Sequence, residues 1–262
     1  MPLMSIPFYK YQGTGNDFVM IDNRNLLFPK NNTELVAKLC DRKFGIGADG
    51  LILLETASIA DFKMVYYNAD GNTGSMCGNG GRCLVAFAKK LGIISDTATF
   101  EATDGMHEAT ISNDHISLKM IDVSHVEKFE DYLFLDSGSP HHVTFVDNVN
   151  DVNVKISGRK IRYGAPYFET GTNVNFVEQV NENTFKVRTY ERGVEDETLS
   201  CGTGVTAVAI SAHSAHKTKS NTVSLNTPGG SLEVSFNHHN NTFTNVFLKG
   251  PATLVFNGEI DV

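Results

Sequence analysis

The sequence has few cysteines, no long apolar run and a shortage of positive charge. Four cysteines in 262 residues are too few for a disulfide scaffold, so we expect a reducing compartment, the cytoplasm. No apolar run is long enough to span a bilayer, and the opening MPLMSIPFYK lacks the pattern of a signal peptide. The formal net charge of −8 argues against nucleic acid or an anionic membrane as a partner.

Two common kinds of site are also missing. There is no Cys-x-x-Cys pair, and His213 and His216 lie three residues apart without an obvious third ligand, so no metal site is expected. GIGADG (45–50) matches the glycine pattern of a dinucleotide-binding turn, but it follows a helical segment and precedes a strand. Such a turn requires the reverse order, and there is no Walker sequence either. We expect these glycines to shape a loop.

What is present is the composition of an ordinary globular chain, with 41% hydrophobic and 20% charged residues. Its length allows one large domain or two small ones. Short alternating, β-branched or aromatic segments separated by Gly, Asn and Asp predict many strands. The expected strands are 18–22, 51–55, 62–67, 97–102, 115–120, 142–146, 185–190, 222–226, 231–236, 244–248 and 253–256.

Three segments have the pattern of helices. Residues 83–91 and 205–216 are apolar on nearly every side, which predicts two buried helices. Residues 33–42 are amphipathic and are expected to form a surface helix. Strands and helices together predict a mixed α/β (α+β) fold.

The two buried helical segments begin alike. MCGNGGRC (76–83) and SCGTGVTA (200–207) both have Cys-Gly-polar-Gly before the apolar run, with Cys77 and Cys201 placed 124 residues apart. The same offset relates Val19 to Val143. We therefore predict two copies of one unit, each a mixed or antiparallel sheet wrapped around a central helix, with a boundary near residue 122. Two-fold pseudo-symmetry would place the two helix N-termini face to face across a cleft between the domains, where small ligands commonly bind.

These positions suit reactive cysteines. A helix N-terminus favours a thiolate and also binds a carboxylate, because its first amides lack partners within the helix. Most free cysteines are instead buried as small hydrophobic residues. That interpretation fits Cys40 and Cys83, which lie in apolar helical runs, whereas Cys77 and Cys201 are interpreted as functional.

Polar residues gather at the ends of the predicted strands. Glu191 and Arg192 end a strand shortly before Cys201, and Asn68 leaves its strand nine residues before Cys77. A guanidinium at that place would suit a bidentate grip on a carboxylate. Alternatively, the pair is an ordinary solvated surface pair, and each asparagine is an ordinary turn residue.

Five segments together resemble the diaminopimelate epimerase family, in its order and across the whole chain: GTGNDFVMID, GIGADG, NADGNTGSMCGNGGRC, GTNVNFVE and YERGVEDETLSCGTG. The resemblance implies two pseudo-symmetric α/β domains, residues 1–121 with 251–262 and residues 122–250, with the active site between them. It implies the interconversion of LL- and meso-diaminopimelate on the lysine and peptidoglycan pathway, without a metal, pyridoxal phosphate or other cofactor.

The resemblance also assigns roles by position. The two catalytic bases are Cys77 and Cys201. The backbone clamp on the reacting carboxylate comprises Gly78, Asn79, Gly202 and Thr203. The remaining substrate contacts are Asn16, Asn68, Asn173, Glu191 and Arg192. The residues that tune the thiol pKa values are His141 and Glu191. The aromatic position linked to homodimer packing is Phe256.

The sequence departs from the family pattern at three places. Gly50 stands where members often have glutamine, Ser139 stands where asparagine is common, and one residue is inserted between Arg192 and Cys201. The nearest alternative function is a cofactor-independent amino-acid racemase of the proline racemase type on the same fold. A second alternative is a non-catalytic amino-acid-binding protein, against which the presence of both cysteines argues.

Overall fold

A computed structural model describes residues 5–74 and 76–261. The chain divides into two compact units: unit 1 runs to Leu118 and resumes at Pro251, and unit 2 comprises Lys119–Gly250. Both units combine sheet and helix, so the predicted mixed α/β class is confirmed. No helix among the described residues is long and apolar enough to cross a membrane.

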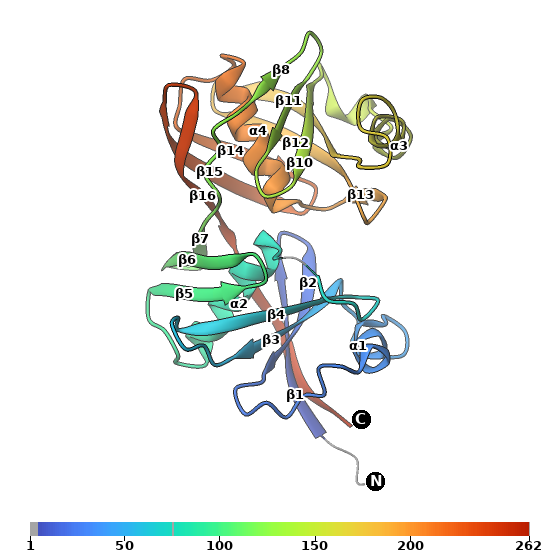
Figure 1. The fold of residues 1–262 in the computed structure, drawn as a ribbon, viewed down its shortest axis with the longest axis vertical. Coiled ribbons are helices and arrows are strands. Elements are labelled where there is room, and N and C mark those ends of the chain that lie inside the picture. The colour runs from blue at the N-terminus through green and yellow to red at the C-terminus, as the bar shows by residue number, and fades with distance from the viewer. Residues whose placement is uncertain (1–4, 75, 262) are drawn as a thin grey trace. The chain divides into compact units, whose positions relative to one another are not determined.

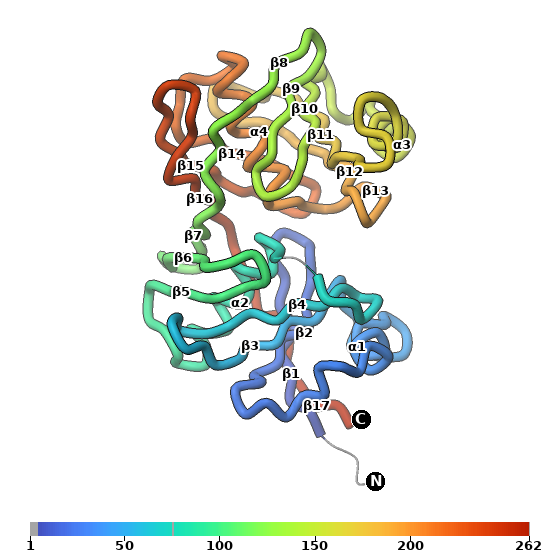
Figure 2. The backbone as a smooth tube through the Cα atoms, viewed as in Figure 1, coloured from blue at the N-terminus to red at the C-terminus, as the bar shows by residue number. Residues whose placement is uncertain are grey.

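Unit 1 is built on a mixed sheet in which the first and last strands of the chain pair. β1 (Ser5–Gly13) lies antiparallel to both β17 (Thr253–Asp261) and β2 (Asn16–Asp22), and β1 and β17 run together in Figure 2. The next strands follow in chain order, with β2/β3 and β4/β5 parallel and the other pairs antiparallel. They are β3 (Gly50–Glu55), β4 (Phe62–Asn68), β5 (Thr97–Ala102), β6 (Gly105–Ser112) and β7 (His115–Lys119).

Helix α2 (Gly78–Lys90) packs against this sheet and forms the centre of unit 1 (Figure 1). Its first turns and Phe87 are buried, which confirms the predicted buried helix. The helix begins five residues before the expected start at 83, and its glycines pack closely on the core: a Cβ at Gly80 would lie 2.9 Å from Ile52 Cδ1, and one at Gly81 would lie 3.2 Å from Leu118 Cδ2. Packing here outweighs the low helix propensity of glycine.

Helix α1 (Thr33–Cys40) is amphipathic, as predicted for 33–42. Val36, Leu39 and Cys40 are buried, and Asn32 caps the helix by accepting from the Leu35 amide. The GIGADG segment forms the loop between α1 and β3, which confirms the expected loop. Cys40 and Cys83 are buried, as expected for core residues.

Unit 2 repeats the strand order of unit 1. Its β10/β11 and β12/β14 pairs are parallel, the other pairs are antiparallel, and a short strand, β13 (Asp196–Thr198), adds to the end of β12. The order across the sheet is β8 (Glu127–Lys128), β9 (Leu133–Asp136), β10 (Pro140–Phe145), β11 (Asn173–Asn181), β12 (Thr184–Glu191), β14 (Thr222–Thr227), β15 (Gly230–His239) and β16 (Thr242–Pro251).

Helix α4 (Gly202–Ser214) is the counterpart of α2 and is buried from Gly204 to Ala212. The two helices begin 124 residues apart, at 78 and 202, and so do β2 and β10, at 16 and 140. A short helical turn, η1 (Val149–Asp151), and helix α3 (Val154–Tyr163) occupy the place that α1 has in unit 1. The expected helix at 205–216 is therefore confirmed, with an earlier start and end.

Candidate active site

Cys77 and Cys201 are the N-cap residues of α2 and α4. Their backbones are extended, with φ/ψ of −113°/124° and −123°/116°, and the helices begin at the following glycines. The first intrahelical bonds run from the Gly81 amide to Cys77 O (2.7 Å) and from the Val205 amide to Cys201 O (3.0 Å). Neither sulfur caps its own helix, so in both units a thiol stands beside amides for which the helix provides no acceptor.

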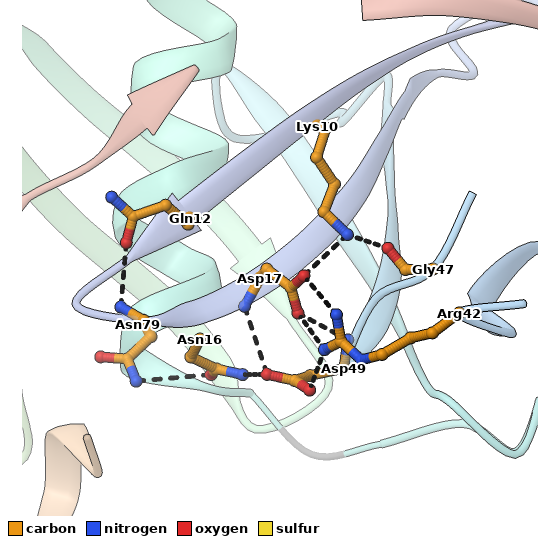
Figure 3. A network of polar contacts seen from close by, with 9 residues as sticks. Lys10, Gln12, Asn16, Asp17, Arg42, Gly47, Asp49 and Asn79 are labelled. Atoms are coloured by element: carbon orange, nitrogen blue, oxygen red, sulfur yellow. Dashed lines mark hydrogen bonds and ion pairs between the residues drawn. The ribbon is translucent and has the colours of Figure 1, made fainter. Parts of the chain in front are cut away.

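In unit 1, Asn16 contacts Cys77. The Asn16 Oδ1 accepts from Cys77 Sγ (3.6 Å) and from Asn79 Nδ2 (3.4 Å), and the Asn16 Nδ2 donates to Asp49 Oδ2 (2.7 Å). Figure 3 shows the contacts of Asn16 with Asn79 and Asp49. Because a carboxylate can only accept from the amide nitrogen, Asp49 fixes the orientation of Asn16 and turns its oxygen toward the thiol.

A group of four charged residues supports Asn16. Arg42 donates to Asp17 through both Nη atoms (2.9 and 2.7 Å) and to Asp49 Oδ1 (2.7 Å), and Lys10 pairs with Asp17 (2.8 Å) and donates to Gly47 O (Figure 3). Burial alone would raise the pKa of Asp17, but the hydrogen bonds and charges of Arg42 and Lys10 lower it to about 2. The group holds two cations and two carboxylates, so its charges balance.

In unit 2, His141 is linked to Cys201 through Thr203. The fully buried His141 contacts Thr203 Oγ1 through Nε2 (2.9 Å), and Thr203 Oγ1 lies 3.5 Å from Cys201 Sγ. Burial, and secondarily the charge of Arg192, lower the pKa of His141 to about 3. The imidazole is therefore neutral at pH 7.

The hydrogen bonds around His141 fix its tautomer. Thr189 Oγ1 donates to Asn175 Oδ1 (3.0 Å), which leaves Asn175 Nδ2 to donate to His141 Nδ1 (3.0 Å). With Nδ1 accepting, Nε2 carries the proton and can donate toward Thr203. At the end of this chain of donors, the Thr203 hydroxyl can donate a hydrogen bond to Cys201 Sγ when the sulfur is a thiolate.

Asn173, Ser139 and Arg192 lie together beside this chain. Asn173 Nδ2 donates to Ser139 Oγ (3.1 Å), and Asn173 Oδ1 accepts from the Arg192 amide (2.9 Å). Ser139 Oγ contacts His141 Nε2 (3.0 Å) and Thr203 Oγ1 (3.1 Å). The Arg192 side chain donates to Thr170 O (3.0 Å) in an exposed contact, which leaves further donors of its guanidinium for a ligand.

The other expected site residues are placed less centrally. Asn68 ends β4 and is exposed, with its backbone in the turn that includes Asn72, and Glu191 ends β12 opposite Asp196. At Gly50 an added Cβ would lie 2.5 Å from a ring carbon of Tyr66. The Tyr66 ring therefore fills the space beside β3 into which a glutamine at position 50 would have to extend.

Several site residues lay outside the sequence predictions, namely Asn175, Thr189, Asp17 and Asp49. For Asn175 a signal existed, because it lies two residues after Asn173 and residues at that spacing share one face of a strand. The others are recognised only once distant segments pair. Asp49, for example, reaches Asn16 across the parallel pairing of β2 and β3.

Solved structures identify the class of fold. The chain superposes on a phenazine biosynthesis protein of the PhzF family from Bacillus anthracis with a TM-score of 0.79, at 12% identity and covering 99% of this chain and 100% of that one. It superposes on a hydroxyproline epimerase from Agrobacterium vitis with a TM-score of 0.70, at 12% identity and covering 98% and 93%. At such low identity these likenesses define the fold, which is shared by proteins of different names.

The sequence comparisons identify the family. The sequence model described as diaminopimelate epimerase matches residues 8–126 and 133–255. A relative from Flavobacterium psychrophilum named diaminopimelate epimerase is 63% identical over 249 residues, which cover 95% of this chain and 97% of the relative. The chain belongs to the diaminopimelate epimerase family, which confirms the resemblance seen in its motifs.

Proposed function

We propose that the protein epimerises diaminopimelate, interconverting its LL and meso forms as a step toward lysine and peptidoglycan. The observation that carries this proposal is the matched pair of cysteines that begin α2 and α4, in a chain of this family. An epimerase without a cofactor needs one group that removes a proton and another that delivers one, and two thiols at helix N-termini meet that need.

The proposed reaction comprises two proton transfers, one on each face of the α-carbon. A thiolate removes the α-proton from one face of the carbon, and the second cysteine, as a thiol, delivers a proton to the other face. The chemistry requires both sulfurs to approach the same carbon. At the end of the turnover the thiolate and the thiol have exchanged roles, so the enzyme is ready for the reverse direction.

The difficult part is the charge that develops on the substrate. As the α-proton leaves, negative charge moves onto the α-carboxylate, and amide donors that meet it there lower the barrier. The amides of Gly78, Asn79, Gly202 and Thr203 are proposed for this task. They belong to first helical turns, where the helix itself offers no acceptor.

The remaining residues are proposed to hold the rest of the substrate and to tune the thiols. Asn16, Asn68, Asn173 and Glu191 are assigned to substrate contacts, with Arg192 gripping the distal carboxylate. His141, together with Glu191, is assigned to the pKa of the thiols, and the path through Thr203 supports this role for Cys201.

We also propose a cytoplasmic homodimer. Two thiols that must alternate between thiolate and thiol need a reducing compartment. For the dimer, Phe256 on β17 is 46% exposed and packs edge-on against Phe8 with ring centroids 5.9 Å apart. An exposed aromatic residue of this kind suits a contact with a second copy, and sedimentation of wild type and Phe256→Asp tests it.

Solvent deuterium tests the proposed reaction. LL-diaminopimelate incubated with the enzyme in D2O should gain deuterium at one α-carbon as the meso form appears, measured by mass spectrometry and chiral chromatography. L-proline and trans-4-hydroxy-L-proline are the controls, since the fold is shared with a hydroxyproline epimerase. Exchange into a proline substrate but not diaminopimelate would establish the racemase alternative. Binding of diaminopimelate without exchange would establish a binding protein.

A further inference from the structure

Arg82 is a fully buried cation one turn into α2 beyond Cys77. Its side chain is 0% exposed and makes four hydrogen bonds. The Nη2 donates to Asn79 Oδ1 (3.1 Å) and to Thr14 Oγ1 (3.2 Å), and the Nη1 and Nε donate to Gly78 O (3.4 Å) and Pro251 O (3.5 Å). All four acceptors are uncharged.

Other buried cations of this chain have carboxylate partners. Lys10 pairs with Asp17 at 2.8 Å, and Arg162 pairs with Glu195 at 3.2 Å. Within residues 5–74 and 76–261, Arg82 has no carboxylate at ion-pair distance. A buried unpaired charge is costly, and a guanidinium keeps its proton in proteins. The environment of Arg82 therefore favours a negative group nearby.

Two thiols interact electrostatically with Arg82, those of Cys83 and Cys77. Burial raises the pKa of Cys83 to about 12, although Arg82 opposes the rise, so Cys83 is neutral at pH 7. Cys77 is only half-buried and stands at the N-terminus of α2, where negative charge is favoured. Of the two thiols, Cys77 is the one that can carry the charge.

The other charged groups on this side of unit 1 do not replace Arg82. Asn16, which contacts Cys77, is backed by Lys10, Asp17, Arg42 and Asp49, two cations and two carboxylates whose charges balance (Figure 3). Arg82 is a net positive charge that interacts electrostatically with Cys77.

The repeat provides an internal comparison. The position in α4 that corresponds to Arg82 is Thr206, whose hydroxyl donates to Gly202 O (2.9 Å). In unit 1, Arg82 holds the turn before β2 through Thr14, whereas in unit 2 Ser137 Oγ holds the matching turn by donating to Thr203 O (2.8 Å). A hydrogen bond from an uncharged group is therefore enough to hold the turn. The positive charge of Arg82 is not needed for that and must have another role.

We propose that Arg82 is a positioning residue that keeps Cys77 as the thiolate of the resting enzyme, while Thr206 leaves Cys201 as the thiol. Arg82 does so in two ways. Its charge acts directly on the sulfur, and its bond to Asn79 Oδ1 turns Asn79 Nδ2 toward Asn16. The inference rests on the proposed two-thiol function, because only that function defines a resting enzyme. The ionisation of Cys77 itself is measured without substrate.

Alkylation of each cysteine by iodoacetamide across pH 5–10, resolved by peptide mass spectrometry, tests the proposal. In wild type, Cys77 should titrate at lower pH than Cys201. In Arg82→Met the midpoint for Cys77 should rise by about one unit, which slows its alkylation at pH 7 roughly tenfold. Arg82→Lys should keep part of the effect, and the Cys201 profile should stay unchanged in both variants.

Two controls separate charge from structure. Arg162→Met removes a buried arginine of unit 2 and should leave the midpoint for Cys77 unchanged. Loosening of unit 1 would expose the buried Cys40 and Cys83 and speed their alkylation, whereas loss of the charge alone leaves both protected. An unshifted Cys77 midpoint in Arg82→Met with Cys83 still protected would overturn the inference.

The wild-type measurement stands even if Arg82→Met does not fold, because a wild-type Cys201 that titrates before Cys77 also overturns the inference. Deuterium exchange keeps the two proposals apart. A shifted Cys77 midpoint without any exchange into diaminopimelate would support the role of Arg82 and reject the epimerase.

Discussion

At the scale of single residues, the two cysteines differ in what surrounds them although their backbones are alike. Cys77 meets an amide oxygen held by a carboxylate and has a buried guanidinium behind it, whereas Cys201 meets a hydroxyl next to a neutral imidazole. The proposed reaction has the two thiols alternate as acid and base, and it does not require their surroundings to be identical.

Replacing either cysteine should end the reaction. Cys77→Ala and Cys201→Ala should each lower epimerisation to background, because one of the two proton-transfer groups is lost. The fold should persist in both variants, because neither change removes a large core contact. Serine at either position should give at most poor activity, since a hydroxyl is a much weaker acid than a thiol. Steady-state assays with circular dichroism check both statements. Near-wild-type turnover in an alanine variant would reject the two-thiol reaction.

Arg192 distinguishes a distal carboxylate contact from an ordinary surface arginine. If Arg192 holds that carboxylate, Arg192→Ala should lower kcat/KM for diaminopimelate by roughly 30- to several-thousand-fold, the effect of losing about 2–5 kcal/mol from a charge-assisted contact. Arg192→Lys should restore only part, because an ammonium cannot form the planar fork. The control is Arg159→Ala on the exposed face of α3. A change in kcat/KM within a few-fold for Arg192→Ala would show that Arg192 is an ordinary surface arginine.

Some of these residues could be predicted from the sequence, and others could not. Cys77 and Cys201 were identifiable because a local motif repeats, and the burial of Cys40 and Cys83 followed from apolar runs. The contacts of Asn16 with Asp49, or of Thr189 with Asn175, join segments that only strand pairing brings together. Arg82 gave no signal at all, since an arginine in a helix is usually exposed.

At the scale of elements, the start of each central helix decides where the sulfur lies. Local propensity predicted a later start for α2 and α4, because glycines disfavour helix. Those glycines pack tightly against the core, and this tertiary contact outweighs their low helix propensity. Tertiary contact also explains why α3 was not predicted, because its polar sequence VKISGRKIRY packs a few apolar residues against β11 and β12.

Gly204 tests this packing. A Cβ at position 204 would lie 2.7 Å from Asn175 Oδ1 and 3.3 Å from Cys201 Sγ. We expect Gly204→Ala to displace both groups and to lower kcat at least tenfold while the helix persists. Ser211→Ala on the same helix is the matched control. The Ser211 hydroxyl is buried without a partner in the described parts of the chain, so its removal should leave kcat unchanged and raise stability by about 1 kcal/mol. Unchanged kcat in Gly204→Ala would show that α4 can shift without lowering the activity.

At the scale of the whole molecule, the two units respond differently to acid. In unit 2, burial lowers the pKa of His141 from 6.5 to about 3 and that of His142 to about 4. A group whose pKa is depressed on folding stabilises the fold above its unfolded pKa, and that contribution is lost as the pH falls toward the folded value. For unit 2 the loss begins below about pH 6.5. For Asp17 in unit 1 it begins only below its unfolded value of 3.8.

Hydrogen exchange resolved by unit checks this order. Between pH 6 and pH 4.5, protection in unit 2 should fall while that in unit 1 is largely kept. His142→Gln should flatten the pH dependence of unit 2 by about one proton, or about 1.4 kcal/mol per pH unit, because the glutamine binds no proton on unfolding. His125→Gln, at an exposed position, should not. Equal loss of protection in both units would contradict the assignment.

The pairing of β1 with β17 also bears on how the protein is made. β17 leaves the ribosome after every strand of unit 2, yet it belongs to the sheet of unit 1 and pairs along nearly the whole of β1. Unit 2 therefore has all of its strands before β17 is made, whereas the sheet of unit 1 around Cys77 must wait for β17. A chain truncated just after residue 250 should accordingly keep unit 2 resistant to protease while β1 lacks its outer neighbour. The unit whose first strands are made first is the last to be completed.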